Sequence, residues 1–221
     1  GDRFEFMMNT PTDACFNRKV RSSRLKRVAF GVGLALLLVI ISLSAYAIYI
    51  VEQNNFHTVA LGQVYRSAQM NREDLARRIQ QYDIKSIINL RGENLKTDWH
   101  QAEIAASAQA NVVHYDWGMS AGDELSVAKM NELIALLRAA PKPVLIHCQS
   151  GADRTGLASA LYCYAIEKQP PEIADGQLTV WYGHLPFFWL KEQAMDHSFW
   201  RYVSNHIAHA ELNFRPKPIS P

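Results

Sequence analysis

Cysteine is scarce in this chain, and its placement indicates no disulfide framework. The 221 residues contain three cysteines, at positions 15, 148 and 163. The eight histidines show no spacing typical of metal ligands, and the sequence contains no internal repeat or low-complexity tract. A disulfide-stapled domain, a repeat architecture and a metal centre are therefore not expected, and no cofactor is indicated.

Net charge is also small, but the charges are unevenly distributed. The formal net charge is +2 and hydrophobic residues make up 48% of the chain, which suits one well-packed core and gives no reason to expect a nucleic-acid partner. Six basic residues and no acidic residue lie between Arg18 and Arg27. The following 24 residues, 28–51, carry no charge and are long enough to cross a bilayer as a helix.

We interpret residues 28–51 as an uncleaved transmembrane anchor that follows a basic cytoplasmic tail, residues 1–27. A buried core helix would show a polar stripe, and this run is interrupted only by Ser42, Ser44, Tyr46 and Tyr49. A cleaved signal peptide is the alternative, because Ala45-Tyr-Ala47 fits a small-x-small cleavage site, although the apolar run continues to Val51. Since basic segments tend to stay in the cytoplasm, we expect the rest of the chain outside it, in a periplasmic or extracellular location.

The remaining sequence predicts one α/β domain over residues 56–210, after a short polar linker at 52–55. Strand-like runs alternate with helical patterns of about a dozen residues, which indicates a mainly parallel sheet flanked by helices on both faces. The expected strands are 58–65, 84–90, 111–117 and 143–147, and the expected helices are 71–82, 98–110, 126–140 and 155–167. Residues 211–221 are expected to form a disordered tail.

The segment from Val144 to Gly156 carries the strongest functional signal. An apolar strand ends at His147-Cys148, five residues intervene before Arg154, and Thr155 opens a helical pattern. Such a turn aims backbone N–H groups and a helix N-terminus at one small volume, which suits a phosphate dianion. The residues expected to bind the phosphate are Gln149, Ser150, Gly151, Ala152, Asp153 and Arg154.

Cys148 would lie at the floor of this turn. The helix end and Arg154 favour its thiolate, which is the nucleophilic form, and the Arg154 guanidinium can donate to two phosphoryl oxygens at once. A cysteine at the end of a buried strand is, taken alone, more often a small hydrophobic residue. The complete string has few explanations other than a site of covalent phosphoryl transfer.

The string His-Cys-x2-Gly-x2-Arg-Thr-Gly resembles the signature of the cysteine-dependent protein tyrosine and dual-specificity phosphatases. The resemblance implies a phosphatase fold of that type without a metal, with Cys148 as nucleophile and Arg154 as phosphate clamp. It also implies that Gly151 is a close-approach turn residue, that the Thr155 hydroxyl eases departure of the thiolate, and that His147 positions the loop.

Two further segments resemble the atypical dual-specificity phosphatases of plants and fungi and their bacterial relatives. They are Val64–Gln69 and Lys85–Arg91, so the resemblance extends from Val64 to Gln169. By this resemblance Arg91 supports the phosphate loop, the alternative being a surface charge at a strand end. Arg66 is expected to be a structural hydrogen-bond donor rather than a ligand.

The general acid is expected on a separate loop. Asp123 is preferred because residues 118–123 resemble the acid-bearing loop of dual-specificity enzymes. Asp116 is the alternate acid, because it precedes Cys148 by a separation like that in related phosphatases, and Glu124 is a distant third candidate.

The loop also constrains the substrate. Enzymes that act on polyphosphoinositides or inositol pyrophosphates tend to carry Lys or Arg inside this loop, whereas residues 149, 150, 152 and 153 are neutral or acidic here. We expect a membrane-anchored phosphatase acting on one accessible phosphomonoester, in a phosphorylated protein or a singly phosphorylated lipid. The alternatives are a pseudophosphatase that binds phosphorylated ligands without turnover and a rhodanese-like sulfur transferase.

Overall fold

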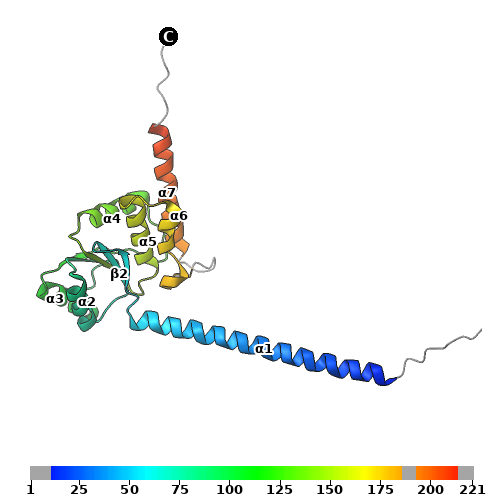
Figure 1. Ribbon diagram of the computed structural model, residues 1–221. Coiled ribbons are helices and arrows are strands. Elements are labelled where there is room, and N and C mark those ends of the chain that lie inside the picture. Colours follow the sequence, from blue (N-terminus) through cyan, green and yellow to red (C-terminus); the bar gives the residue numbers. More distant parts are fainter. Residues whose placement is uncertain (1–10, 186–192, 214–221) are drawn as a thin grey trace, which may run out of the picture. The chain divides into compact units, whose positions relative to one another are not determined.

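A computed structural model describes residues 11–185 and 193–213, with side chains described at 26–185 and 193–208 (Figure 1). The chain divides into two compact units, Gly1–Tyr49 and Ile50–Pro221. The expected disordered tail, residues 211–221, is wrong at its start, because residues 211–213 continue helix α7 (Gln193–Asn213), and residues 214–221 lie outside the described residues.

Helix α1, Pro11–Glu52, includes the apolar run. Its portion Lys26–Glu52 is long and apolar enough to cross a membrane, judged by length and composition, and none of its most apolar window is buried. A core helix of a soluble domain would be mostly buried, so the exposure of these side chains agrees with a membrane span or a signal sequence.

The second unit is built on a five-stranded sheet of order β1-β2-β5-β3-β4. β1 (His57–Ala60) and β2 (Val64–Ser67) are antiparallel. The four strands β2, β5 (Val144–His147), β3 (Ser86–Asn89) and β4 (Val113–Asp116) run parallel to one another. The predicted mixed α/β fold with a mainly parallel sheet is confirmed.

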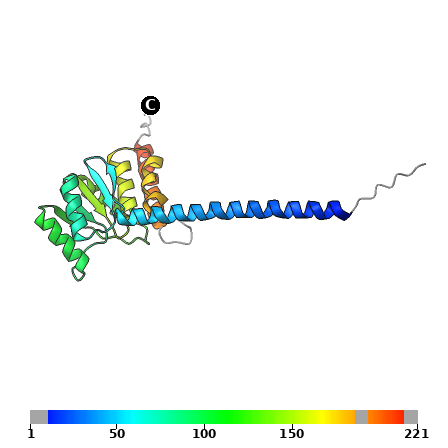
Figure 2. The ribbon, with the colours of Figure 1, turned by 60° about the horizontal axis from the view of Figure 1, so that its bottom comes forward.

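Helices cover both faces of the sheet (Figures 1 and 2). Because side chains alternate along a strand, Ile87 and Leu145 pack with α2 (Arg72–Tyr82) and α3 (Asp98–Gln109) in one core cluster. Ile88 and Ile146 point to the opposite cluster, which includes residues of α4 (Val127–Ala139), α5 (Asp153–Leu161) and α7 (Gln193–Asn213). The remaining short elements are η1 (Tyr162–Ile166), α6 (Pro171–Ala174), η2 (Asp175–Gln177) and η3 (Val180–Tyr182).

Two sequence predictions near the start of this unit are wrong in detail. The run 58–65 is not one strand but parts of β1 and β2, because Gly62 takes a left-handed φ of 69° and turns the chain between them. Residues 52–55 are not simply a linker, because Asn54 donates from its side-chain amide to Asp74 and Asn55 is 2% exposed. Both asparagines have positive φ, a conformation that asparagine tolerates better than most residues.

Candidate active site

The phosphate-loop segment, residues 148–154, connects the central strand β5 to α5. β5 lies between β2 and β3, and its residues are all buried. Cys148 follows directly and is 1% exposed, while α5 begins at Asp153. The segment therefore lies at the carboxyl ends of three parallel strands, where ligands bind in such sheets.

Arg66 holds the phosphate loop by donating hydrogen bonds to the backbone carbonyls of the loop. The side chain is fully buried on β2, and its Nη2 donates to the carbonyls of Gly151 at 2.8 Å and Ala152 at 3.3 Å. Its Nη1 donates to both the backbone and side-chain oxygens of Gln177, and the guanidinium lies over the Tyr182 ring. Burial lowers the pKa of Arg66 to about 10, which still leaves it charged at neutral pH. The prediction that Arg66 is a structural donor is confirmed.

Two other donors hold the preceding carbonyls. The side-chain amide of Asn55 donates to the carbonyl of Ser150 at 2.9 Å and to that of Tyr182 at 2.9 Å. The backbone N–H of Gln69 donates to the carbonyl of Gln149 at 3.2 Å. All four carbonyls of residues 149–152 therefore accept hydrogen bonds from neighbouring elements, Ala152 also from the N–H of Gly156.

The N–H groups of the same residues remain as donors. Within the described part of the chain, no residue accepts a hydrogen bond from the backbone N–H groups of residues 149–152. These groups, together with the start of α5, form a set of oriented donors of the kind that binds an anion.

Gly151 allows the loop to approach β2 closely. Its φ is 73°, and a Cβ at this position would lie 2.6 Å from the backbone nitrogen of Ala68 and 2.7 Å from the carbonyl oxygen of Ser67. Any side chain would displace the loop from β2, so the interpretation of Gly151 as a close-approach turn residue agrees with the geometry.

The side chains that end the loop are largely buried. The Thr155 hydroxyl is buried and has no hydrogen-bond partner among the described residues. The same holds for Nε of Arg154. Nη1 of Arg154 donates to the carbonyl of Met119 at 3.4 Å, which brings the segment 117–125 against the phosphate loop.

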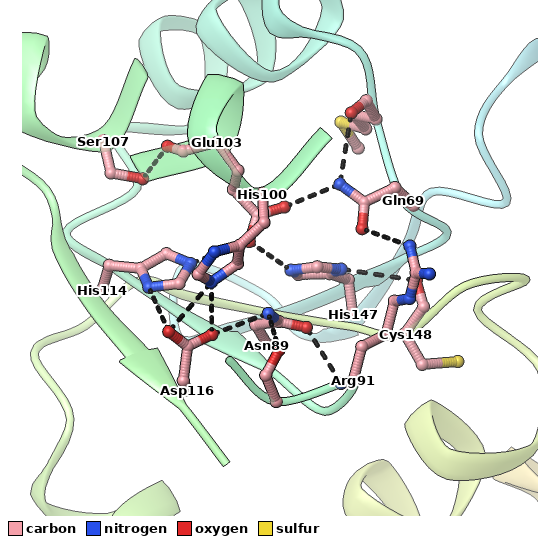
Figure 3. A network of polar contacts seen from close by, with 12 residues as sticks. Gln69, Asn89, Arg91, His100, Glu103, Ser107, His114, Asp116, His147 and Cys148 are labelled. Atoms are coloured by element: carbon pink, nitrogen blue, oxygen red, sulfur yellow. Dashed lines mark hydrogen bonds and ion pairs between the residues drawn. The ribbon is translucent and has the colours of Figure 1, made fainter. Parts of the chain in front are cut away.

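His147 is fixed by a carboxylate that the sequence did not indicate (Figure 3). Its Nε2 lies 3.0 Å from Oε1 of Glu103, which comes from α3 and is 3% exposed. Nε2 of His114 lies 2.7 Å from the same oxygen, and the side-chain amide of Gln69 donates to the other one. Burial alone would raise the pKa of Glu103, but the adjacent His147 and His114 outweigh it and hold that pKa well below its ordinary value.

Asp116, the alternate acid, lies at the end of β4 and is already engaged (Figure 3). Its Oδ1 accepts from the amide of Asn89 at 2.7 Å, and both carboxylate oxygens lie 3.0 Å from Nε2 of the buried His100. Its side chain is 22% exposed. These contacts fix the carboxylate within the sheet edge rather than leave it on a movable loop.

Asp123, the preferred acid, lies in the segment that crosses Arg154. Asp123 is exposed and lies between Met119 and Leu125. The N–H of Met119 donates to the carbonyl of Leu90, and the N–H of Leu125 donates to the Ser198 hydroxyl. Glu124 pairs with His197 and Arg201 on α7. Asp123 is thus the candidate on an exposed segment anchored at both ends.

Arg91 lies beside the phosphate loop. Its guanidinium lies over the Trp99 ring at 3.8 Å, and its Nη1 donates to the side chain of Gln69 at 3.3 Å. Burial and then the like charge of Arg154 lower the pKa of Arg91. The two guanidinium groups therefore affect each other, which favours the supporting position over an isolated surface charge.

A cavity of about 340 Å³ borders the loop within the second unit. Its lining includes Gln149, Ser150 and Ala152 from the loop, and none of its eleven lining residues carries a formal charge. Among the described residues, no group of three or more His, Cys, Asp or Glu side chains is arranged to hold a metal ion.

Sequence reasoning missed four side chains that support this site: Asn55, Gln69, Glu103 and His184. The Asn-Asn pair after the helix was a signal, because asparagine favours left-handed positions at helix ends. Glu103 and His184 gave none, since their partners are distant in sequence: Glu103 lies 44 residues from His147 and His184 lies 31 residues from Asp153.

The comparisons with known proteins agree with this geometry. A family model described as "Tyrosine phosphatase family" matches residues 50–179, more than half of the chain. No curated protein sequence is significantly similar to this chain.

Solved structures share the fold at low sequence identity. A TpbA variant from P. aeruginosa in complex with phosphotyrosine aligns with a TM-score of 0.58 and 20% identity, covering 72% of this chain and 91% of that one. The catalytic core of the PP-IP phosphatase SIW14 from S. cerevisiae, in complex with citrate, aligns with a TM-score of 0.52 and 22% identity, covering 73% of this chain and 94% of that one. PTPMT1 aligns with a TM-score of 0.51 and 15% identity, covering 69% of this chain and 99% of that one. With the loop geometry and the family match together, the chain belongs to the tyrosine phosphatase family, within the superfamily of cysteine-dependent tyrosine and dual-specificity phosphatases.

Proposed function

We propose that this protein is a membrane-anchored phosphatase that hydrolyses phosphomonoesters through a phosphocysteine intermediate. The observation that carries the proposal is the phosphate loop itself. Its four carbonyls, at residues 149–152, are held outward by Asn55, Arg66, Gln69 and the first turn of α5, which leaves its N–H groups to bind a dianion above Cys148. Donors that are already oriented do not have to reorganise during the reaction.

In the proposed first step the Cys148 thiolate attacks phosphorus, and the bond from phosphorus to the ester oxygen breaks. Arg154 and the loop N–H groups bind the equatorial oxygens, while Asp123 gives a proton to the leaving alcohol. In the second step water attacks the phosphocysteine, loses a proton to Asp123, and releases inorganic phosphate and the thiolate. The Thr155 hydroxyl, which is buried with no hydrogen-bond partner among the described residues, would stabilise the departing sulfur.

The supporting residues in this proposal act on the loop rather than on phosphate. His147 is held by Glu103, and Arg91 adds a second positive charge beside Arg154. Their role is to keep the loop shape and its positive potential constant between substrate binding and turnover.

We further propose a substrate with one phosphomonoester, in a phosphorylated protein or a singly phosphorylated lipid. The loop offers no cation besides Arg154, and the adjacent cavity is lined without charged residues, so a polyphosphorylated head group would gain little there. The similar TpbA structure holds phosphotyrosine, which carries a single phosphomonoester.

The experiment that tests this function compares the full chain with its Cys148→Ser variant, both purified in detergent. We expect phosphate release from para-nitrophenyl phosphate, a phosphotyrosine peptide or a singly phosphorylated lipid, and none above background from the variant. The variant should still bind inorganic phosphate. Retained turnover in Cys148→Ser would contradict the covalent mechanism.

A second candidate function, phosphate binding without turnover, is favoured by one observation. Asp116 already contacts Asn89 and His100, and Glu124 pairs with His197 and Arg201, so if Asp123 is not the acid, neither other candidate is a free carboxylate. Phosphate binding combined with an inactive parent protein would indicate this function. Membership of the tyrosine phosphatase family argues against the sulfur transferase.

The anchor and its orientation belong to the same proposal. The exposed apolar surface of residues 28–51 supports a membrane span, and the basic cluster before it supports a cytoplasmic N-terminus with the phosphatase domain outside the cytoplasm. A product that begins near Ile48 and stays soluble would instead show a cleaved signal peptide.

A further inference from the structure

His184 connects the phosphate loop to α7 through two carboxylates. Its ring is fully buried, with Nδ1 2.7 Å from Oδ1 of Asp153 and Nε2 2.8 Å from Oδ2 of Asp196. Asp153 is the loop residue next to Arg154 and the first residue of α5, and Asp196 belongs to the first turn of α7. The Gly183 turn, with φ of 78°, and a hydrogen bond from the His184 N–H to the carbonyl of Thr179 place the ring there.

The contacts of His184 require a protonated ring. An ionised carboxylate only accepts hydrogen bonds, and a neutral imidazole has a single N–H, so two carboxylate partners need both nitrogens protonated. Burial by itself lowers the pKa of His184, but the hydrogen bonds that the ring donates to Asp153 and Asp196 outweigh it and raise that pKa to about 9. The ring is therefore a cation at neutral pH.

A cation at this position offsets a negative charge that the sequence places in the phosphate loop. Asp153 places a negative charge next to Arg154 in a segment that has to bind a dianion, and like charges at short range disfavour each other. We infer that His184 is a positioning residue whose imidazolium, shared with Asp196, holds the Asp153 carboxylate and offsets part of its charge, so that the loop can bind a phosphate dianion. The inference rests on the proposed phosphatase function and adds to it a residue that lies outside the signature string.

Among the described residues, four charged groups surround this contact, and they set its pH dependence. Asp153 faces the ring from α5 and Asp196 from α7. Asp175 lies on η2, where burial and then Asp196 raise its pKa while His184 lowers it, and Arg66 acts on Asp153 from β2. Because the pKa of His184 is raised, the ring keeps its positive charge through the ordinary histidine range and loses it as pH rises through about 9. Above that pH, Asp153 loses the positive charge of its hydrogen-bonded partner His184.

The test measures equilibrium binding of inorganic phosphate to the full chain in detergent, in a Cys148→Ser background that prevents turnover. Adding His184→Gln should weaken phosphate binding roughly tenfold to hundredfold, because an uncharged amide leaves Asp153 uncompensated. Adding Asp153→Asn to the same protein should return the affinity to within about threefold of the Cys148→Ser parent, because the repelling charge is gone. His206→Gln, an exposed histidine on α7, is the matched control and should bind phosphate like the parent.

The rescue separates charge compensation from a purely structural role. If the protein carrying both His184→Gln and Asp153→Asn binds phosphate as weakly as His184→Gln alone, His184 only supports packing and the inference is wrong. It is equally wrong if His184→Gln binds like the parent.

A pH titration decides the question if His184→Gln does not fold. Phosphate affinity of the Cys148→Ser protein should fall between about pH 8 and about pH 10, where inorganic phosphate stays dianionic, and Asp153→Asn should remove most of that fall. Identical pH profiles in the two proteins would overturn the inference. Complete absence of phosphate binding by the Cys148→Ser parent at every pH would instead refute the proposed function, and the inference with it.

Discussion

Replacing Gly151 with alanine tests whether the phosphate loop depends on its close approach to β2. Alanine at φ 73° costs about 1–2 kcal/mol, because its Cβ approaches the following carbonyl oxygen. The added Cβ would also lie 2.6 Å from Ser67 and Ala68 backbone atoms, which cannot rotate away as a side chain can. Overlap of this kind costs a further ~1–3 kcal/mol as the backbone shifts.

We therefore expect Gly151→Ala to lower the free energy of unfolding by about 2–5 kcal/mol. The displaced loop should also lose kcat/KM for para-nitrophenyl phosphate by roughly 100-fold, because a shift of about 1 Å misplaces the donors around the phosphate. Denaturant unfolding and steady-state hydrolysis by the full chain in detergent measure the two effects separately.

Two other glycines provide matched controls. Gly62 has φ of 69°, but no described atom lies within 4 Å of an added Cβ. Gly62→Ala should therefore show the backbone cost of about 1–2 kcal/mol and keep its activity. Gly176 has neither constraint, so Gly176→Ala should change stability by less than about 0.5 kcal/mol. If Gly151→Ala loses no more stability or activity than Gly62→Ala, the close contact with β2 does not shape the loop.

Three shorter predictions concern the clamp, the buried carboxylate and the anchor. Arg154→Lys should reduce kcat/KM by at least ~100-fold at unchanged fold stability, because one ammonium cannot make two parallel hydrogen bonds; near-parental kinetics would contradict the clamp. Glu103→Gln should destabilise the fold by about 1–3 kcal/mol at neutral pH. Since the pKa of Glu103 is lowered from about 4.5, its contribution is present above that pH and is lost in stronger acid, so parent and variant should converge there and a constant difference would refute the assignment. A reporter that works only outside the cytoplasm, fused after Pro221, should be active with the protein still in carbonate-washed membranes, whereas cytoplasmic reporter activity would reverse the orientation.

The sequence was sufficient to predict the parts of the site that are local. β5, the loop and the start of α5 are consecutive, so an apolar strand followed by His147-Cys148 and Arg154-Thr155 specified their order and the direction of the loop donors. The start of the helix expected over 71–82 was predictable for the same reason, because the Asn71 side chain accepts from the N–H of Asp74 three residues later. The single strand predicted over 58–65 failed because the apolar residues on both sides of Gly62 concealed a turn.

The contacts that shape the loop could not be predicted from the sequence. Asn55 reaches Ser150 across 95 residues, and Arg66 reaches Gly151 across 85. An amide or a guanidinium has many possible acceptors, and the tertiary fold alone selects one. The same limit applies to Asp116. Its spacing from Cys148 made it an acid candidate, but the sequence could not indicate its contact with His100.

The final prediction separates the two acid candidates, because their surroundings differ. A true general acid contributes about 10²–10⁴-fold to rate, and most where the leaving group is a poor one. Asp123→Asn should therefore slow hydrolysis of an alkyl phosphate strongly and that of para-nitrophenyl phosphate much less, and should remove the alkaline limb of the kcat profile.

Asp116→Asn is the comparison. Its carboxylate already accepts from Asn89 and lies 3.0 Å from the buried His100, so the substitution should lower stability and change both substrates by one similar, smaller factor. Leaving-group dependence in Asp116→Asn rather than in Asp123→Asn would exchange the two roles, which would require Asp116 to leave His100 during catalysis. Dependence in neither variant, in a parent that still hydrolyses alkyl phosphates, would direct attention to Glu124, whose pairing with His197 and Arg201 would then have to open.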